Sequence, residues 1–245
     1  MKKSRVVVLA GNPNSGKTTL FNALTGSRQH VGNYPGVTVE KKEGACRADG
    51  EELRVVDLPG TYSLTAYSQE ERVARNFIIE ERPDVVVDVV DASNLERNLY
   101  LAVQIMELGV PVVLAFNMSD VAKARGLEFD LQEMSRLLGV PIVPTVGSRG
   151  EGLKELLAAA VRAAKAGAAA RPVEIHYGAD VEQAIARIAV RLEAQAPRAG
   201  ADRTRWTAIK LLENDAEVAQ RVTAGEIHLL VKAEQERLGA LLGDS

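Results

Sequence analysis

The chain has 245 residues, a formal net charge of −3 and a pI of about 5.8, and no basic stripe supports a nucleic-acid partner. Its single cysteine, Cys46, excludes an internal disulfide and any metal site built from several cysteines. No apolar run approaches the roughly 18 residues that a membrane span needs, so we expect a cytoplasmic chain that does not itself cross a membrane.

The first predicted element is a buried strand at residues 5–10, and a helical pattern follows at residues 17–25. Between them, residues 11–18 read G-N-P-N-S-G-K-T, which matches the phosphate-binding loop pattern in its strand–loop–helix context. Lys17 is expected to reach the β- and γ-phosphates, and the Thr18 hydroxyl to bind magnesium. The loop N–H groups and the positive end of the helix dipole both favour phosphate. The residues expected to contact nucleotide here are Asn14, Ser15, Gly16, Lys17, Thr18 and Thr19.

Two switch segments follow the phosphate-binding loop. Residues 31–38 contain two glycines and a proline, which suit a loop that changes conformation. Thr38 is the expected switch threonine, whose hydroxyl completes the magnesium shell only when the γ-phosphate is present. Residues 57–60 read D-L-P-G and match the D-x-x-G switch pattern. Asp57 is expected to hold magnesium through water, and the Gly60 N–H to meet the γ-phosphate.

The source of the catalytic charge is the open question of this sequence. Ras-like proteins carry a glutamine after D-x-x-G that orients the attacking water, but Thr61 stands at that position. Arg28 and Arg72 lie in the switches, where solvated side chains are the favoured interpretation. Asn14 could instead help to bind a monovalent cation beside the phosphates. The residues expected to act in catalysis are Lys17, Thr38, Gly60 and Asn14.

A base-binding motif follows the predicted strand 112–116. Residues 117–120 read N-M-S-D and resemble the N-K-x-D pattern that selects guanine, with Met118 in place of lysine. The Asp120 carboxylate would accept two hydrogen bonds from guanine, which adenine cannot supply; the alternative is a helix cap formed by Asp120. The loop 145–150 suits the fifth guanine-nucleotide motif. The residues expected to contact the base are Asn117, Met118, Asp120, Gly147 and Ser148.

Apolar strands that alternate with helical patterns predict an α/β domain with a mostly parallel sheet. Six strands are expected, two of them forming a hairpin at one edge: 5–10, 37–44, 52–57, 85–90, 112–116 and 140–144. Helices are expected at 17–25, 70–81, 95–108, 131–138 and 153–165, and then, without further strands, at 179–195, 203–213, 215–222 and 225–242. We therefore expect a nucleotide-binding domain at 1–168 and a small all-α domain at 169–245, with a helix break at Arg171-Pro172 and a turn at 196–201.

Several segments together resemble the N-terminal cytosolic region of FeoB, a family of bacterial ferrous-iron transporters. The most specific are D-A-S-N-L-E-R-N-L-Y-L at 91–101 and R-W-T-A-I-K-L-L-E at 205–213; the others lie at 11–26, 31–40 and 57–64. The resemblance implies a Ras-like GTPase domain and a helical domain that slows nucleotide release. It also implies potassium-assisted hydrolysis, with Asn14 and the backbone carbonyls of Gly32 and Tyr34 as potassium ligands.

The chain departs from this family at two positions. Tyr34 stands where tryptophan is common, and Gly147 stands where serine or alanine is common; methionine at position 118 is frequent in the family. The family's membrane transport domain is absent from this sequence and is the implied partner. We therefore expect a truncated or split protein that does not itself move iron.

The expected function is a magnesium-dependent, potassium-stimulated GTPase that binds GTP and GDP and regulates ferrous-iron uptake at the cytoplasmic face of the bacterial inner membrane. Two alternatives stay open. One is a GTPase of tRNA modification or ribosome assembly, and the other is a nucleotide-dependent binding switch with negligible turnover. The sequence leaves the oligomeric state open, a homo-oligomer included.

Overall fold

The structure, a computed structural model, describes residues 4–26, 29–65, 67–167, 175–195 and 201–243. The chain divides into two compact units, Met1–Val173 and Glu174–Ser245. The domain boundary expected between residues 168 and 169, and the expected break at Arg171-Pro172, lie outside the described residues, as does most of the turn expected at 196–201.

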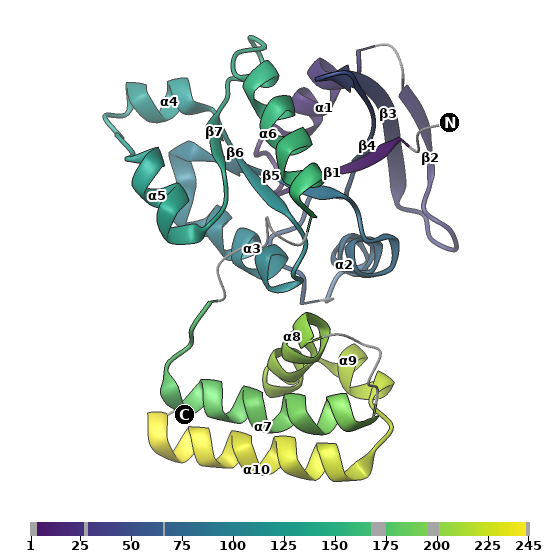
Figure 1. The fold of residues 1–245 in the computed structure, drawn as a ribbon, viewed down its shortest axis with the longest axis vertical. Coiled ribbons are helices and arrows are strands. Elements are labelled where there is room, and N and C mark those ends of the chain that lie inside the picture. The colour runs from purple at the N-terminus through teal and green to yellow at the C-terminus, as the bar shows by residue number, and fades with distance from the viewer. Residues whose placement is uncertain (1–3, 27–28, 66, 168–174, 196–200, 244–245) are drawn as a thin grey trace. The chain divides into compact units, whose positions relative to one another are not determined.

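The first unit is built on a mixed sheet of seven strands in the order β2-β3-β4-β1-β5-β6-β7. Parallel pairing joins β4, β1, β5, β6 and β7, whereas β2 and β4 both run antiparallel to β3. Figure 1 shows β2 at one edge of this sheet and β7 at the other. The strands are β1 (Arg5–Gly11), β2 (Gln29–Asn33), β3 (Glu40–Ala48), β4 (Glu51–Asp57), β5 (Val85–Asp91), β6 (Val112–Asn117) and β7 (Ile142–Pro144).

Strand β2 corrects the expected count of six. Its sequence, Q-H-V-G-N, has no apolar alternation, and all five of its residues are exposed. Backbone pairing with β3 holds it at the sheet edge, from Gln29 opposite Gly44 to Asn33 opposite Glu40, and the Gln29 side chain also donates to the Gly26 carbonyl at 2.8 Å. A strand without a buried face gives no periodic signal, which is why the pattern missed it.

Helices cover both faces of the sheet, and the strand alternation shows which residues face each layer. One core cluster joins Val7, Leu9 and Val87 of the central strands to apolar side chains of α1 and α6, among them Phe21 and Leu156. Helix α3 packs on β5 and β1. The helices are α1 (Lys17–Thr25), α2 (Gln69–Glu81), α3 (Leu95–Glu107), α4 (Ser119–Ala124), α5 (Leu131–Leu138) and α6 (Leu153–Ala166).

The strand register brings the motifs together at the carboxyl ends of the parallel strands. Leu9 of β1 lies opposite Asp57 of β4, and Gly11 opposite Val89 of β5. Asn117, the last residue of β6, lies opposite Asp91 of β5. The loops that follow these parallel strands therefore meet beyond their carboxyl ends, where open α/β sheets bind ligands.

The second unit is helical, as expected, over the residues described. Its helices are α7 (Ala179–Gln195), α8 (Ala201–Leu212), α9 (Ala216–Arg221) and α10 (Gly225–Leu242). The buried residues Ile185, Ile188 and Leu192 line one face of α7, and Trp206 and Ile209 are buried on α8. Over the described parts of both units, no helix is long and apolar enough to span a membrane.

Candidate nucleotide-binding site

The phosphate-binding loop needs glycine at two positions. Gly16, the residue before α1, has φ 84°, and a Cβ there would lie 2.2 Å from Asn117 Nδ2. A Cβ on Gly11 would lie 2.6 Å from the Val89 carbonyl oxygen. Asn14 sits in the same loop with a left-handed φ of 67°, which asparagine tolerates better than most residues. The backbone thus follows the tight path that lets N–H groups surround a phosphate.

Lys17 and Asp57 form a buried ion pair behind this loop. Lys17 Nζ donates to Asp57 Oδ1 at 2.5 Å, and both side chains are less than 10% exposed, at 8% and 6%. Burial raises the pKa of the Asp57 carboxyl, while Lys17 and a hydrogen bond from the Thr18 side chain oppose that rise. The structure therefore brings together the phosphate-binding lysine and two of the three residues expected to hold magnesium.

This donor set fits magnesium. Among the described residues, no group of three or more His, Cys, Asp or Glu could hold a metal ion. Magnesium in nucleotide sites needs no such cage, because one carboxylate, hydroxyls, phosphates and water complete its octahedron. Thr18, and Asp57 through water, are therefore placed as the expected magnesium site requires.

Asn117 connects the base-binding motif to the phosphate-binding loop. It is buried, its Nδ2 donates to the Ser15 carbonyl at 2.8 Å, and its Oδ1 accepts from the Gly147 N–H at 2.9 Å. The Thr145 hydroxyl donates to the same oxygen at 3.3 Å. One amide thus connects two loops, of which one lies 102 residues before Asn117 in the chain and the other 30 residues after it.

Met118, Gly147 and Ser148 are the other residues of this motif and loop that are expected to contact the base. Met118 has φ 58°, and its Cε lies 3.6 Å from the position of a Cβ on Gly16, so its thioether packs against the loop. A Cβ on Gly147 would lie 3.4 Å from Asn117 Oδ1 and 3.5 Å from a Leu20 methyl, which are ordinary van der Waals contacts, so a small side chain would fit there. Ser148 is exposed in the adjoining turn.

Asp120 is paired with a residue that the sequence reasoning missed. Its Oδ2 accepts from Arg149 Nη2 at 2.7 Å, and Arg149 Nε also approaches Glu151 Oε1 at 3.1 Å. Helix α4 is capped at Met118 rather than by the Asp120 side chain, so the structure does not support the helix-cap alternative. The Asp120 carboxylate, which is expected to contact guanine, is thus exposed and held by an arginine.

The D-x-x-G segment lies against the phosphate-binding loop. A Cβ on Gly60 would lie 3.4 Å from Pro13 Cα, and the Thr61 N–H donates to the Gly11 carbonyl at 3.3 Å. Thr61 is only 4% exposed. Its buried side chain is therefore not placed like a glutamine that orients solvent.

The first switch segment forms part of the edge hairpin. Thr38 is exposed in a bend between β2 and β3, and Gly32 lies within β2 opposite Lys41. The Tyr34 carbonyl accepts from the Val37 N–H at 3.3 Å. No hydrogen bond described here joins Asn14 to Gly32 or Tyr34, so the expected potassium ligand set stays a prediction.

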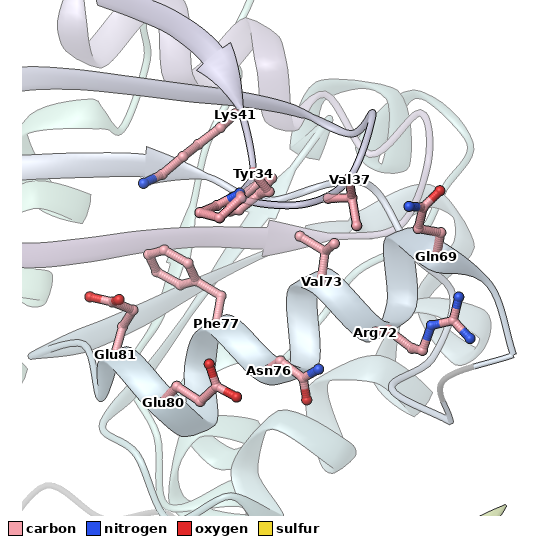
Figure 2. Close-up of a pocket in the computed structure, with 11 residues that line it drawn as sticks. Tyr34, Val37, Lys41, Gln69, Arg72, Val73, Asn76, Phe77, Glu80 and Glu81 are labelled. Carbon is pink, nitrogen blue, oxygen red and sulfur yellow. The ribbon is translucent and has the colours of Figure 1, made fainter. Parts of the chain in front are cut away.

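A pocket of about 380 Å³ lies between this segment and α2. Figure 2 shows Tyr34 and Val37 facing Val73 and Phe77 across it. The Tyr34 and Phe77 rings meet edge to face at a centroid distance of 5.9 Å. Arg72 lines this pocket, and Arg28, the other arginine considered for catalysis, lies outside the described residues.

The sheet order, the phosphate-binding loop after β1 and the base motif after β6 define a Ras-like P-loop GTPase domain. Residues 5–160 match the sequence family described as ferrous iron transport protein B, and residues 177–245 match the FeoB cytosolic helical domain. The chain therefore belongs to the FeoB family.

Curated relatives agree with this assignment. The chain is 42% identical over 241 residues to the Fe(2+) transporter FeoB of Escherichia coli K12, covering 96% of this chain and 30% of that protein. It is 46% identical over 214 residues to a Fe(2+) transport protein A/FeoB fusion protein of Porphyromonas gingivalis, covering 86% and 25%. The chain thus spans between a quarter and a third of the length of these relatives.

Solved structures share the fold over nearly the whole chain. An S. thermophilus NFeoB mutant bound to mGDP superposes with a TM-score of 0.89 at 36% identity, covering 99% of this chain and 92% of that one. The cytosolic domain of T. maritima FeoB in a GDP form gives a TM-score of 0.83 at 36% identity, covering 99% and 98%.

Proposed function

We propose that the chain binds GTP and GDP with magnesium and hydrolyses GTP, with potassium stimulation. The observation that carries this proposal is the Asn117 side chain, which bonds the phosphate-binding loop at Ser15 and the base loop at Gly147. That contact fixes the distance between a phosphate site and a purine site. The GDP-bound relatives support the choice of guanine.

The described residues divide the chemistry between them. Lys17 would leave Asp57 for the β- and γ-phosphates, Thr18 would join the magnesium shell, and the freed Asp57 carboxylate would hold that shell through water. Thr38 completes that shell when the first switch segment closes on the γ-phosphate. The Gly60 N–H meets the γ-phosphate, and the backbone around it orients the attacking water. The bound cations supply positive charge against the charge that develops on the phosphoryl oxygens.

Asn14 is the residue on which the potassium proposal depends. It is exposed in the phosphate-binding loop, so its amide oxygen is accessible to a cation. Gly32 and Tyr34 would add backbone carbonyls after the first switch segment closes. Thr61 gives no side chain for the water, and a bound cation would supply the positive charge that an arginine finger supplies in other GTPases.

In the cell, we propose that GTP turnover regulates ferrous-iron uptake through a membrane transport domain, with this chain at the cytoplasmic face of the inner membrane. The full-length FeoB relatives support that role. They also favour it over tRNA modification or ribosome assembly. Because Thr61 is buried, one alternative stays open, which is a nucleotide-dependent switch with negligible turnover.

Steady-state GTP hydrolysis in potassium and in sodium, with magnesium constant, tests the proposal. We expect faster hydrolysis in potassium for the wild type and loss of that difference in Asn14→Ala. Asn14→Gly is the matched variant, because it removes the same amide without strain at a φ of 67°. GDP binding should survive in both variants. Equal rates in the two salts would exclude potassium assistance, and no turnover in either salt would leave the binding switch.

A further inference from the structure

Helix α3 begins in the segment 91–101, which the proposed mechanism leaves without a role. Two of its side chains reach the residues that follow D-x-x-G. The Arg97 guanidinium lies over the Tyr62 ring, with Cζ 4.0 Å from the ring centroid. Gln104, two turns further along the same face, accepts from the Leu64 N–H through Oε1 at 2.6 Å.

The backbone of Arg97 contacts the phosphate-binding loop. Asn12, which is 3% exposed, donates from Nδ2 to the Arg97 carbonyl at 3.2 Å. Thr61, next to Tyr62, donates its N–H to Gly11 of the same loop. Arg97 therefore touches the phosphate-binding loop through its carbonyl and the second switch through its guanidinium.

We infer that Arg97 is a positioning residue for GTP hydrolysis, which holds Tyr62 and thereby fixes the backbone of Gly60 and Thr61 against the phosphate-binding loop. This inference rests on the proposed function. It matters because the Thr61 side chain is buried, which leaves the task of orienting water to the backbone, and a contact from outside the loop holds that backbone in place. The cation–π contact supplies that restraint at Tyr62, the residue that follows Thr61.

Substitution of Arg97 tests this contact cleanly. Arg97→Ala removes the guanidinium but keeps the carbonyl that Asn12 binds, and alanine preserves the helix. We expect kcat to fall about two- to fivefold in Arg97→Ala and Tyr62→Ala, the range that an exposed cation–π contact supports. Tyr62→Phe keeps the ring face and should hydrolyse GTP like the wild type, and the GDP dissociation constant should not change in any of them.

The double variant Arg97→Ala/Tyr62→Ala should be no slower than either single variant, because both remove one contact. Tyr100→Ala is the matched control on the same helix, since its side chain is 55% exposed and outside this contact. Additive losses in the double variant, or a Tyr62→Phe rate as low as that of Tyr62→Ala, would overturn the inference.

Hydrogen exchange of nucleotide-free protein separates this inference from the proposed function. Peptides covering residues 57–65 should exchange faster in Arg97→Ala and Tyr62→Ala than in the wild type or Tyr62→Phe. This readout needs no turnover, so the contact can be confirmed even if hydrolysis is absent. Unchanged exchange in Arg97→Ala would show that Arg97 does not restrain the segment.

Discussion

The Asp120–Arg149 pair has consequences for nucleotide affinity. Arg149 donates to one of the two carboxylate oxygens that guanine would use, so base binding has to displace or share that contact. Both side chains are exposed, at 37% and 53%, and such pairs are worth about 0.2–1 kcal/mol. Arg149→Gln should therefore lower the GDP dissociation constant by up to about fivefold.

Fluorescence titration with GDP and IDP measures this effect. IDP lacks the exocyclic amine and needs only one carboxylate oxygen, so it should gain less than GDP from the substitution. Arg136→Gln is a suitable control, because Arg136 forms a similar exposed pair with Glu133 at 2.6 Å on α5. Weaker GDP binding by Arg149→Gln would mean that the arginine orients Asp120 instead of competing with guanine.

Asp88 is a buried acid in the centre of the sheet. It is 1% exposed, neither of its oxygens has a hydrogen-bond partner among the described residues, and burial raises its pKa to about 7. In the unfolded chain it ionises near 3.8, so the folded state holds an extra proton between these values. Stability therefore falls as pH rises from about 4 to about 7, by at most about 4 kcal/mol, and then levels off.

We predict that Asp88→Asn flattens this dependence. Thermal unfolding of wild type and variant should be compared from pH 5 to pH 8, with the wild type losing stability relative to the variant as pH rises. The Leu9→Ala variant, which destabilises the same sheet without a titratable group, controls for pH-independent effects. Parallel pH profiles for wild type and Asp88→Asn would show that this carboxyl does not titrate as described.

At the scale of elements, an aromatic pair attaches the first switch segment to α2. Tyr34 is 6% exposed, its ring packs edge to face on Phe77, and its hydroxyl donates to the Asp57 carbonyl at 3.4 Å. Such pairs contribute about 0.5–1.5 kcal/mol beyond their buried area. Tyr34→Ala and Phe77→Ala should each destabilise the first unit, with a coupling energy in that range.

Urea unfolding followed by far-UV circular dichroism gives the four free energies of this double-mutant cycle. Tyr67→Ala controls for loss of a tyrosine in the neighbouring segment, because its side chain is 90% exposed. Strict additivity of Tyr34→Ala and Phe77→Ala would show that the two rings stabilise the fold independently.

Sequence periodicity predicted some elements well and others not at all, for a physical reason. The central strands β1 and β6 contain continuous runs of buried apolar residues, and β5 has such a run broken only by Asp88, so hydrophobicity locates all three. Strand β2 has no buried face, and α4 has six residues with only Ala122 buried, so neither leaves a pattern. Strand β3 begins at Glu40 instead of 37 because residues 34–37 form a turn.

The candidate site also combines features that the sequence predicts with contacts that it does not predict. The phosphate-binding loop, the D-x-x-G segment and the base motif are local patterns, so the sequence located each of them. Contacts such as Arg149 with Asp120, or Arg97 with Tyr62, join residues 29 and 35 positions apart. No local pattern encodes them, because they depend on how strands and loops converge in three dimensions.

At the scale of the whole molecule, the pKa values of buried acids are shifted in opposite directions in the two units. In the first, burial raises the pKa of Asp88 and of Asp57. In the second, burial of Glu234 favours a higher pKa, but hydrogen bonds from Arg187 at 2.7 Å and Arg237 at 2.8 Å outweigh it and lower the pKa. Stability from Glu234 is present above its ordinary pKa and is lost as pH falls through the lowered one.

Acidification from pH 7 to pH 4 should therefore stabilise the first unit relative to the second. The chain's one tryptophan, Trp206, lies in the helical unit, so its fluorescence follows that unit alone. Far-UV circular dichroism follows both units. We predict that, at pH values below 4.5, the melting temperature followed by Trp206 fluorescence decreases, whereas the melting temperature of the first unit does not decrease with it. Glu234→Gln should lower the melting temperature followed by Trp206 at pH 7 and should make it less sensitive to acid. A single transition that moves identically in both signals would mean that the units unfold together and that the opposite pKa shifts do not separate their stabilities.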